Sequence, residues 1–251
     1  MVRTSKPDTA IAEKTLPKPL YKAVIHIFRQ KISGVVLVGG TALSGFYAGH
    51  RRSDDIDLFV KNGAAFKQTV LAVMTLKEIG ANIKISAHSK QYLKSVCELA
   101  GHVFTVDIVL DENIFTCGSS SVTDNGIVVA DIATIFKMKC ATLLSRCSEK
   151  DLFDLIWLFQ YYPDTTLEQI VIYGRQIDEG MTAETLLYSI SSSSLSKDAC
   201  DFAIDSKYSS VKVFKQIQKL KEILIYELNA YLNISEKNEL SSLVEKIKSL
   251  V

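Results

Sequence analysis

The chain has 251 residues, of which 47% are hydrophobic and 23% are charged, and its formal net charge is +1. This composition is ordinary for a folded protein, with enough residues for one large domain or two small ones. The near-neutral charge excludes a strong overall attraction to nucleic acids or anionic membranes, although local basic clusters remain possible. The five cysteines are odd in number and form no C-x-x-C pair. We therefore expect reduced thiols, not a disulfide framework or a zinc site.

The N-terminal segment, MVRTSKPDTAIAEKTLPKP, is polar and lacks the apolar stretch of a signal peptide. No apolar run approaches the roughly 18 residues that a membrane span requires. The sequence therefore predicts a flexible segment over residues 1–20 and a cytoplasmic protein.

The next part of the chain predicts a mixed α/β domain over residues 21–130. A helix is expected over 17–31, and Phe66, Val70, Val73 and Met74 mark an amphipathic helix that stops near Gly80. Short β-branched or alternating runs predict strands over 35–38, 55–60, 82–86, 92–99 and 103–110. Residues 118–125, GSSSVTDN, are expected to form a loop.

From residue 131 the hydrophobic pattern becomes helical, which predicts an all-helical domain over 131–251. The expected helices cover 131–147, 149–161, 166–175, 181–190, 208–231 and 236–249. The serine-rich run over 191–198 is expected to connect two of them. The fold class is therefore α+β, with a sheet domain followed by a helical domain.

Two carboxylates occupy one face of the strand expected over 55–60. Side chains alternate along a strand, so Asp55 and Asp57 share a face with Phe59. Two like charges this close raise each other's energy, which a divalent metal relieves by accepting carboxylate oxygens. A third acid, Asp107, interrupts the apolar run HVFTVDIVL. The alternative reading is an exposed edge strand with solvated aspartates.

A glycine turn and a basic loop precede these acids. Gly39, Gly40 and Thr41 follow one strand and begin a helix, where glycines allow backbone N–H groups to approach a phosphate. The loop that contains Arg51 and Ser53 adds cations and a hydroxyl group. A solvated surface loop is the alternative, and it suits Arg52 better than these two residues.

Four charged residues lie in otherwise apolar helices of the second half. At 3.6 residues per turn, Lys139 and Arg146 fall on the buried stripe of the helix over 131–147. A cation directed toward packed surface needs an anionic partner, either an aspartate or a bound phosphate. Asp151 and Asp154, one turn apart in the next helix, are candidate partners. They form either a structural ion-pair network or part of a phosphate site.

The segment GGTALSGFYAGHRRSDDIDLF resembles the signature of the polymerase-beta-like nucleotidyltransferase superfamily. Together with KCATLLSRCSEKDLFDL, it is similar to the AbiEii/AbiGii-type nucleotidyltransferase toxins of bacterial toxin–antitoxin and phage-defence systems. The two motifs cover about forty residues. The resemblance implies a polymerase-beta-like domain with a mixed sheet, followed by a helical domain that completes the active-site cleft.

The resemblance also implies roles for single residues. Asp55 and Asp57 would bind Mg²⁺ or Mn²⁺, and Asp107 occupies the place of a third metal-binding carboxylate that is less dependable in this branch. Lys139 would hold phosphate, and Asp154 would be the functional acid of the helical motif. The nucleotide-binding residues would be Gly39, Gly40, Thr41, Arg51, Ser53, Lys139 and Arg146, with Asp151 and Asp54 in supporting positions.

These roles imply transfer of a nucleoside monophosphate from a nucleoside triphosphate (NTP) to an acceptor hydroxyl group. The acceptor would be RNA, such as transfer RNA, or a protein, and a separately encoded antitoxin would neutralise the toxin. Two alternatives remain open: an enzyme that modifies a small molecule such as an antibiotic, and a catalytically silent homologue that binds a partner.

Overall fold

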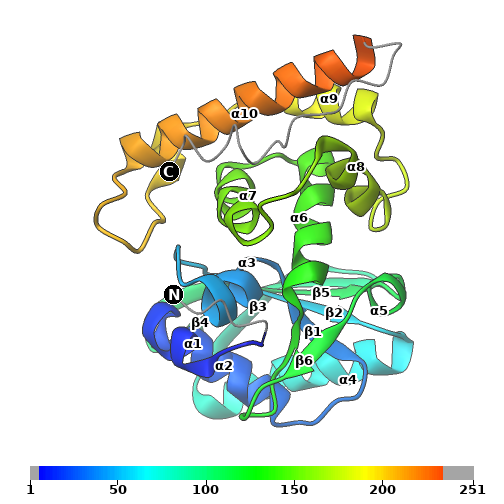
Figure 1. Ribbon diagram of the computed structural model, residues 1–251. Coiled ribbons are helices and arrows are strands. Elements are labelled where there is room, and N and C mark those ends of the chain that lie inside the picture. The colour runs from blue at the N-terminus through cyan, green and yellow to red at the C-terminus, as the bar shows by residue number, and fades with distance from the viewer. Residues whose placement is uncertain (1–5, 234–251) are drawn as a thin grey trace. The chain divides into compact units, whose positions relative to one another are not determined.

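The computed structural model describes residues 6–233 and divides the chain into two compact units, residues 1–135 and 136–251 (Figure 1). The boundary falls in the first turn of helix α6 (Ile132–Ser145). The first unit contains the sheet, and the second unit is helical.

Within residues 6–233, the first unit contains a mixed seven-stranded sheet in the order β3-β4-β5-β2-β1-β7-β6. β2 runs parallel to β5 and β1 parallel to β7, whereas the other neighbours are antiparallel. The strands are β1 (Val35–Val38), β2 (Asp55–Val60), β3 (Asn82–His88), β4 (Tyr92–Leu99), β5 (His102–Leu110), β6 (Ser120–Val122) and β7 (Val128–Ala130). The prediction of an α+β fold with a mixed sheet and a helical second half is confirmed.

β2 lies inside the sheet, between β5 and β1. Its even-numbered side chains, Ile56, Leu58 and Val60, are fully buried, while the odd-numbered ones are half-buried. The reading of Asp55 and Asp57 as solvated residues of an edge strand is therefore wrong, because both flanks of the strand are hydrogen-bonded to neighbours.

Helices α2 and α4 pack against the sheet of the first unit, and both contact β5. α2 is amphipathic, with Leu20, Val24 and Ile27 among its buried residues. The helical segments of this unit are α1 (Thr9–Thr15), α2 (Lys18–Phe28), α3 (Gly39–Leu43), η1 (Ser44–Ala48), α4 (Gly63–Met74), η2 (Thr75–Ile79) and α5 (Ile114–Cys117).

Two sequence expectations for this unit are wrong. The segment expected to be flexible over 1–20 contains α1, whose N-terminus is capped by the Asp8 carboxylate and whose Ala12 is fully buried. The segment expected to be a loop over 118–125 contains β6. Three-residue strands are too short to show a hydrophobic period, and β7 is formed by long-range pairing of Val129 with Leu37.

The second unit consists of helices that pack on one another, with α10 in contact with α9 and α7. Its elements are most of α6, then α7 (Glu149–Tyr161), α8 (Leu167–Arg175), α9 (Ala183–Ser192), η3 (Lys197–Cys200) and α10 (Ser210–Asn233). Each agrees with an expected helix within about two residues, apart from η3. The helix expected over 236–249 lies outside the described residues.

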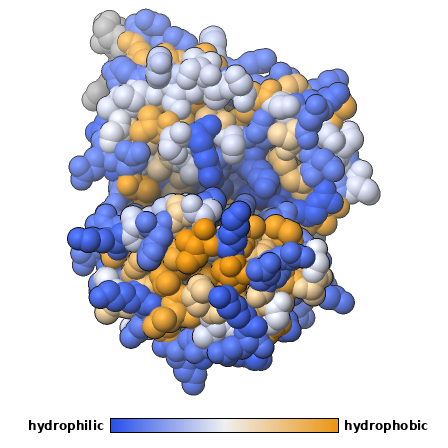
Figure 2. All heavy atoms as spheres, turned by 180° about the vertical axis from the view of Figure 1, so that it is seen from behind, coloured by the Kyte–Doolittle hydropathy of each residue, from blue (hydrophilic) through white to orange (hydrophobic). Residues whose placement is uncertain are grey.

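None of the helices in residues 6–233 is both long and apolar enough to cross a bilayer. On the face shown in Figure 2, hydrophobic side chains gather in a patch bordered by hydrophilic ones. Leu71 and Val122 are among the most exposed large hydrophobic side chains. Exposed apolar surface is common in folded proteins and does not by itself indicate function.

Candidate functional site

Three acidic side chains converge on neighbouring strands of the first unit. In the parallel pairing of β2 with β5, Asp57 is the register partner of Asp107. Adjacent strands lie about 4.8 Å apart, so these two residues are direct neighbours. Asp55 is the register partner of Thr105, whose hydroxyl group donates a 2.7 Å hydrogen bond to the Asp55 carboxylate. The three predicted acids therefore share one region of the sheet.

Asp107 is held by two residues that sequence reasoning missed. Tyr92 on β4 donates a hydrogen bond from its hydroxyl group to one carboxylate oxygen. Lys94 on the same strand places its Nζ atom 3.3 Å from the other oxygen. A polar pair at period two on a predicted strand was visible in the sequence. Its pairing with β5, which puts Lys94 opposite Asp107, was not.

The acids also change the chemistry of Tyr92. Burial, the hydrogen bond to Asp107, and the negative charges of Asp107 and Asp57 raise its pKa to about 12. Tyr92 is therefore a neutral hydrogen-bond donor at ordinary pH, because ionisation would place a further negative charge beside two carboxylates.

The glycine turn lies directly against the acids. Gly39 has a left-handed backbone with a φ of 71°, and a Cβ atom added there would lie 2.0 Å from the Asp57 Oδ2 atom. A Cβ atom added at Gly40 would lie 2.4 Å from Nη2 of Arg51 and 3.1 Å from Oγ of Ser53. A side chain at position 39 would therefore displace the Asp57 carboxylate, and one at position 40 would displace the Arg51 guanidinium group.

The loop before β2 is built into the fold. Arg51 and Ser53 are only 2% and 1% exposed, so the surface-loop reading is wrong for both. Thr41 donates a hydrogen bond to the backbone carbonyl of Asp55 and lies 2.9 Å from the Ser53 hydroxyl group. The Arg51 guanidinium donates to the Arg52 carbonyl at 2.9 Å, and the Arg52 side chain is exposed as expected.

The charged residues of the helical unit form one network. Lys139 is 3% exposed, and its Nζ atom lies 2.8 Å from Asp151 and 2.6 Å from Asp154, both fully buried. Asp151 also accepts hydrogen bonds from Arg146 and from the Ser148 hydroxyl group. Lys139 lies on the buried stripe, as predicted, and its anionic partners are aspartates.

Arg146 departs from the sequence expectation. Its side chain is 63% exposed, although its Nε atom donates to Asp151 at 2.8 Å. Helical spacing placed Arg146 on the buried stripe, but α6 ends at Ser145, so that spacing no longer applies. Arg146 therefore closes the network from the surface.

The sequence profile of the family described as nucleotidyl transferase AbiEii toxin, type IV toxin–antitoxin system, matches residues 24–215 of this chain. The chain belongs to the AbiEii family. All seven strands of the sheet, the glycine turn and the helical network lie within the matched range. The sequence matches no curated protein.

Solved structures add information about the fold of this AbiEii member. MenT4, a nucleotidyltransferase toxin from Mycobacterium tuberculosis, superposes with a TM-score of 0.53 at 13% identity, covering 97% of this chain and 89% of MenT4. JHP933 from Helicobacter pylori gives a TM-score of 0.49 at 16% identity, covering 88% and 94% of the two chains. The similarity to MenT4 shows a shared fold along almost the whole chain.

The acids of this AbiEii chain suit a magnesium ion that is bound partly by the protein and partly by a substrate. Among the described residues, no three His, Cys, Asp or Glu side chains form a ready-made metal cage. Mg²⁺ in phosphoryl-transfer sites is commonly held by one or two carboxylates together with substrate phosphates. Asp55 and Asp57 provide two carboxylates beside a glycine turn that has room for no side chain, and this arrangement fits such an ion.

We expect Gly39→Ala to abolish function through Asp57. The added Cβ atom would displace the Asp57 carboxylate, in addition to about 1 kcal/mol of left-handed backbone strain. Gly80→Ala is the matched control, because Gly80 has a φ of 93° but nothing within 4 Å of an added Cβ atom. Urea unfolding should show a small loss of stability in Gly80→Ala and a larger one in Gly39→Ala, which should still fold, and only Gly39→Ala should lose nucleotide transfer. Equal transfer in the two variants would contradict this assignment.

We expect Asp151 to make stability depend on pH. Burial alone would raise its pKa, but Lys139 and Arg146 outweigh this effect and hold the pKa well below its usual range. A depressed folded-state pKa stabilises the protein above the unfolded value of about 3.9, and this contribution is lost as pH falls further.

The stability gap between wild type and Asp151→Asn measures that contribution. Urea unfolding should show a gap of about 3 kcal/mol or more at pH 7 that narrows below about pH 4. Asp205→Asn is the control, because Asp205 forms an exposed ion pair with Lys207 and should show almost no gap. A gap for Asp151→Asn that stays constant from pH 7 to pH 3 would contradict the assignment.

Proposed function

We propose that this AbiEii chain is a magnesium-dependent enzyme that transfers a nucleoside monophosphate from an NTP to an acceptor hydroxyl group. The observation that carries the proposal is the contact between the glycine turn and the acids. Gly39 lies against Asp57, and Gly40 lies against Arg51 and Ser53. This arrangement brings backbone N–H groups, a guanidinium group and two carboxylates together, as a triphosphate and its metal ion require.

Each group has a defined part in the proposed reaction. Gly39, Gly40, Thr41 and Ser53 would line the triphosphate, and Arg51 would oppose its negative charge. Asp55 and Asp57 would hold Mg²⁺ or Mn²⁺, which when bound neutralises the triphosphate and stabilises charge on the leaving group. Asp107 lies beside Asp57 and would either join them as a ligand or accept the proton of the acceptor hydroxyl group.

The proposed bond changes are those of phosphoryl transfer. The acceptor oxygen forms a bond to the α-phosphorus of the NTP, and the bond from that phosphorus to the bridging oxygen breaks. Pyrophosphate leaves with the electron pair, and the hydroxyl proton passes to a carboxylate or to water. The product is an acceptor that carries one nucleotide.

Lys139 and Asp154 are the proposed functional residues of the helical unit. Lys139 would hold phosphate and Asp154 would be the functional acid, as the family resemblance implies. In support, Lys139 is fixed between Asp151 and Asp154 at 2.8 and 2.6 Å, so its ammonium group has a defined position. Asp151 and Arg146 support this position through their own ion pair, and we assign them structural roles first.

We propose RNA, such as transfer RNA, as the acceptor, with a protein hydroxyl group as the second possibility. Membership of a type IV toxin–antitoxin family implies a cognate antitoxin. Action in the cytoplasm, where NTPs and RNA are present, and a role in phage defence belong to the same proposal.

A transfer assay tests the proposed activity. The protein is incubated with each of the four α-labelled NTPs, with or without Mg²⁺, and with total RNA or total cell protein as acceptor. The expected result is Mg²⁺-dependent label in the RNA fraction from one preferred NTP. Label in the protein fraction would show that the acceptor is a protein and not RNA. If neither fraction is labelled with any of the four NTPs, the proposed activity is rejected.

A further inference from the structure

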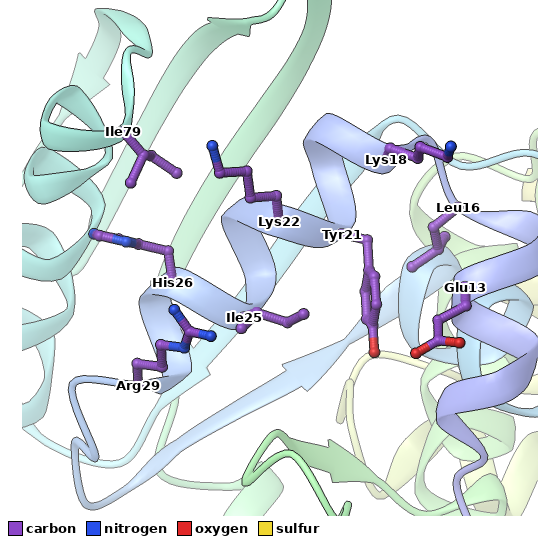
Figure 3. Close-up of a pocket in the computed structure, with 9 residues that line it drawn as sticks. All are labelled: Glu13, Leu16, Lys18, Tyr21, Lys22, Ile25, His26, Arg29 and Ile79. Carbon is purple, nitrogen blue, oxygen red and sulfur yellow. The ribbon is translucent and has the colours of Figure 1, made fainter.

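A hollow of about 430 Å³ lies along α2 in the first unit (Figure 3). Nine residues line it: Glu13, Leu16, Lys18, Tyr21, Lys22, Ile25, His26, Arg29 and Ile79. We call this hollow the α2 groove. Its lining contains three permanent cations, one histidine and a single acid, so it is strongly basic in a chain whose net charge is only +1.

The three cations share one face of α2. At 3.6 residues per turn, Lys18, Lys22 and Arg29 project within an arc of roughly 40°. All three side chains are exposed, and none forms an ion pair or side-chain hydrogen bond with another residue in 6–233. Like charges on one helix face repel one another, so this arrangement lowers stability slightly unless an anion is bound.

The histidine and tyrosine side chains of the groove are anchored to neighbouring elements. His26 shares a 3.0 Å hydrogen bond with Thr75, and the Tyr21 hydroxyl group accepts one at 3.0 Å from Asn125. Figure 3 shows His26 directed towards Ile79, and Tyr21 beside Leu16 and Glu13. The groove therefore has fixed walls, with the long cationic side chains as its adaptable part.

The spacing of the cations favours a polymer over a small anion. Lys18 and Arg29 are eleven residues apart, which is about 16 Å along a helix with a rise of 1.5 Å per residue. One phosphate can contact only neighbouring cations, whereas a nucleic-acid backbone presents a charge at every nucleotide. Tyr21 adds a half-exposed aromatic ring, and basic grooves with aromatic side chains are typical of single-stranded nucleic-acid binding.

Other candidate cations are held in place by contacts within the protein. Arg51 is 2% exposed and packs against the glycine turn, while Lys139 and Arg146 pair with Asp151. These side chains are held by contacts within the protein, whereas Lys18, Lys22 and Arg29 form no ion pair with another residue in 6–233. We infer that the α2 groove binds the phosphate backbone of single-stranded RNA and so holds the acceptor, an inference that rests on the proposed function.

RNA binding at several salt concentrations tests the inference. The probe is a fluorescein-labelled 12-nucleotide oligouridylate, followed by anisotropy, and the groove variant is Lys18→Gln/Lys22→Gln/Arg29→Gln. The control variant, Lys67→Gln/Lys84→Gln/Lys90→Gln, removes the same charge from exposed lysines elsewhere in the unit. The logarithm of the binding constant falls linearly with the logarithm of the salt concentration, by about 0.7 per phosphate contact on a single strand. The groove variant, which lacks three cations, should therefore show a slope that is smaller by about 2.

We expect the groove variant to bind the oligonucleotide at least about tenfold more weakly than the control variant at physiological salt. Unchanged affinity and slope, or equal losses in both variants, would overturn the inference. Thermal unfolding checks that both variants fold. Lys22→Gln alone should show about one third of the change in slope.

Vesicles with 30% phosphatidylserine serve as a second probe. If the groove variant loses affinity for these vesicles but keeps its affinity for RNA, the inference is overturned.

The same variants separate this inference from the proposed activity. If the enzyme transfers nucleotides to RNA, the groove variant should raise the KM for RNA and leave the KM for NTP unchanged. If the protein binds the oligonucleotide through the groove but transfers nothing, the proposed activity fails while the groove assignment stands.

Discussion

Replacing Asp57 by asparagine should lower nucleotide transfer on the order of a thousandfold. Asp57 sits at the centre of the candidate site, in register with Asp107 on one side and with Val38 on the other, against the backbone of Gly39. Asparagine has almost the same shape but carries no charge. The variant should therefore fold normally and lose mainly its affinity for the metal ion.

Asp124→Asn is the matched control, since Asp124 is exposed in the turn between β6 and β7. It makes the same chemical change and should retain full transfer. Single-turnover assays at rising Mg²⁺ concentrations give the rates, and urea unfolding checks the fold. If the folded Asp57→Asn protein transfers nucleotide at a rate within tenfold of the wild-type rate, the assignment of Asp57 to the site is wrong.

Replacing Lys139 by methionine should lower the free energy of unfolding by about 3–5 kcal/mol. Methionine fills a similar volume, but Asp151 and Asp154 then lose a cation that lies within 2.8 Å of both. Both carboxylates are fully buried, so each would be left with less compensation in a region of low polarity. Urea unfolding monitored by circular dichroism measures the loss.

A second substitution separates charge from packing. Lys139→Met/Asp154→Asn replaces one of the two buried carboxylates that have lost their cation. A neutral amide costs less free energy to bury than an unpaired carboxylate. The double variant should recover part of the lost stability but not nucleotide transfer. Lys207→Met, in the exposed pair with Asp205, should leave stability almost unchanged. A single Lys139→Met variant as stable as that control would reject the buried-network assignment.

The sequence indicated much of the sheet because the alternation of hydrophobic side chains along a strand is a local property of the chain. β1, β2 and β4 begin and end at the predicted residues, as does α7. The short strands β6 and β7 were missed because three residues show no period, and because β7 joins the sheet through its pairing with distant β1. The helix α1 was missed for a similar reason, since its position depends on Ala12 being buried against other elements.

The candidate residues themselves were named from residue type, spacing and family resemblance. Charges in apolar runs, such as Asp57 and Lys139, are costly to bury, so their presence in the sequence already indicated partners. Resemblance to AbiEii proteins linked two motifs about a hundred residues apart, and the match over residues 24–215 confirms the family.

Only the tertiary structure decided which partners these charges have. Strand register placed Asp107 beside Asp57 and added Tyr92 and Lys94, because neighbours across a sheet can be far apart in the chain. Folding also buried Arg51 against Gly40, which local patterns in a polar loop do not reveal. The sequence by itself determined which residues are candidates and the family to which they belong. Long-range packing decided which charges the protein neutralises internally, and which cations along α2 lack a partner within residues 6–233.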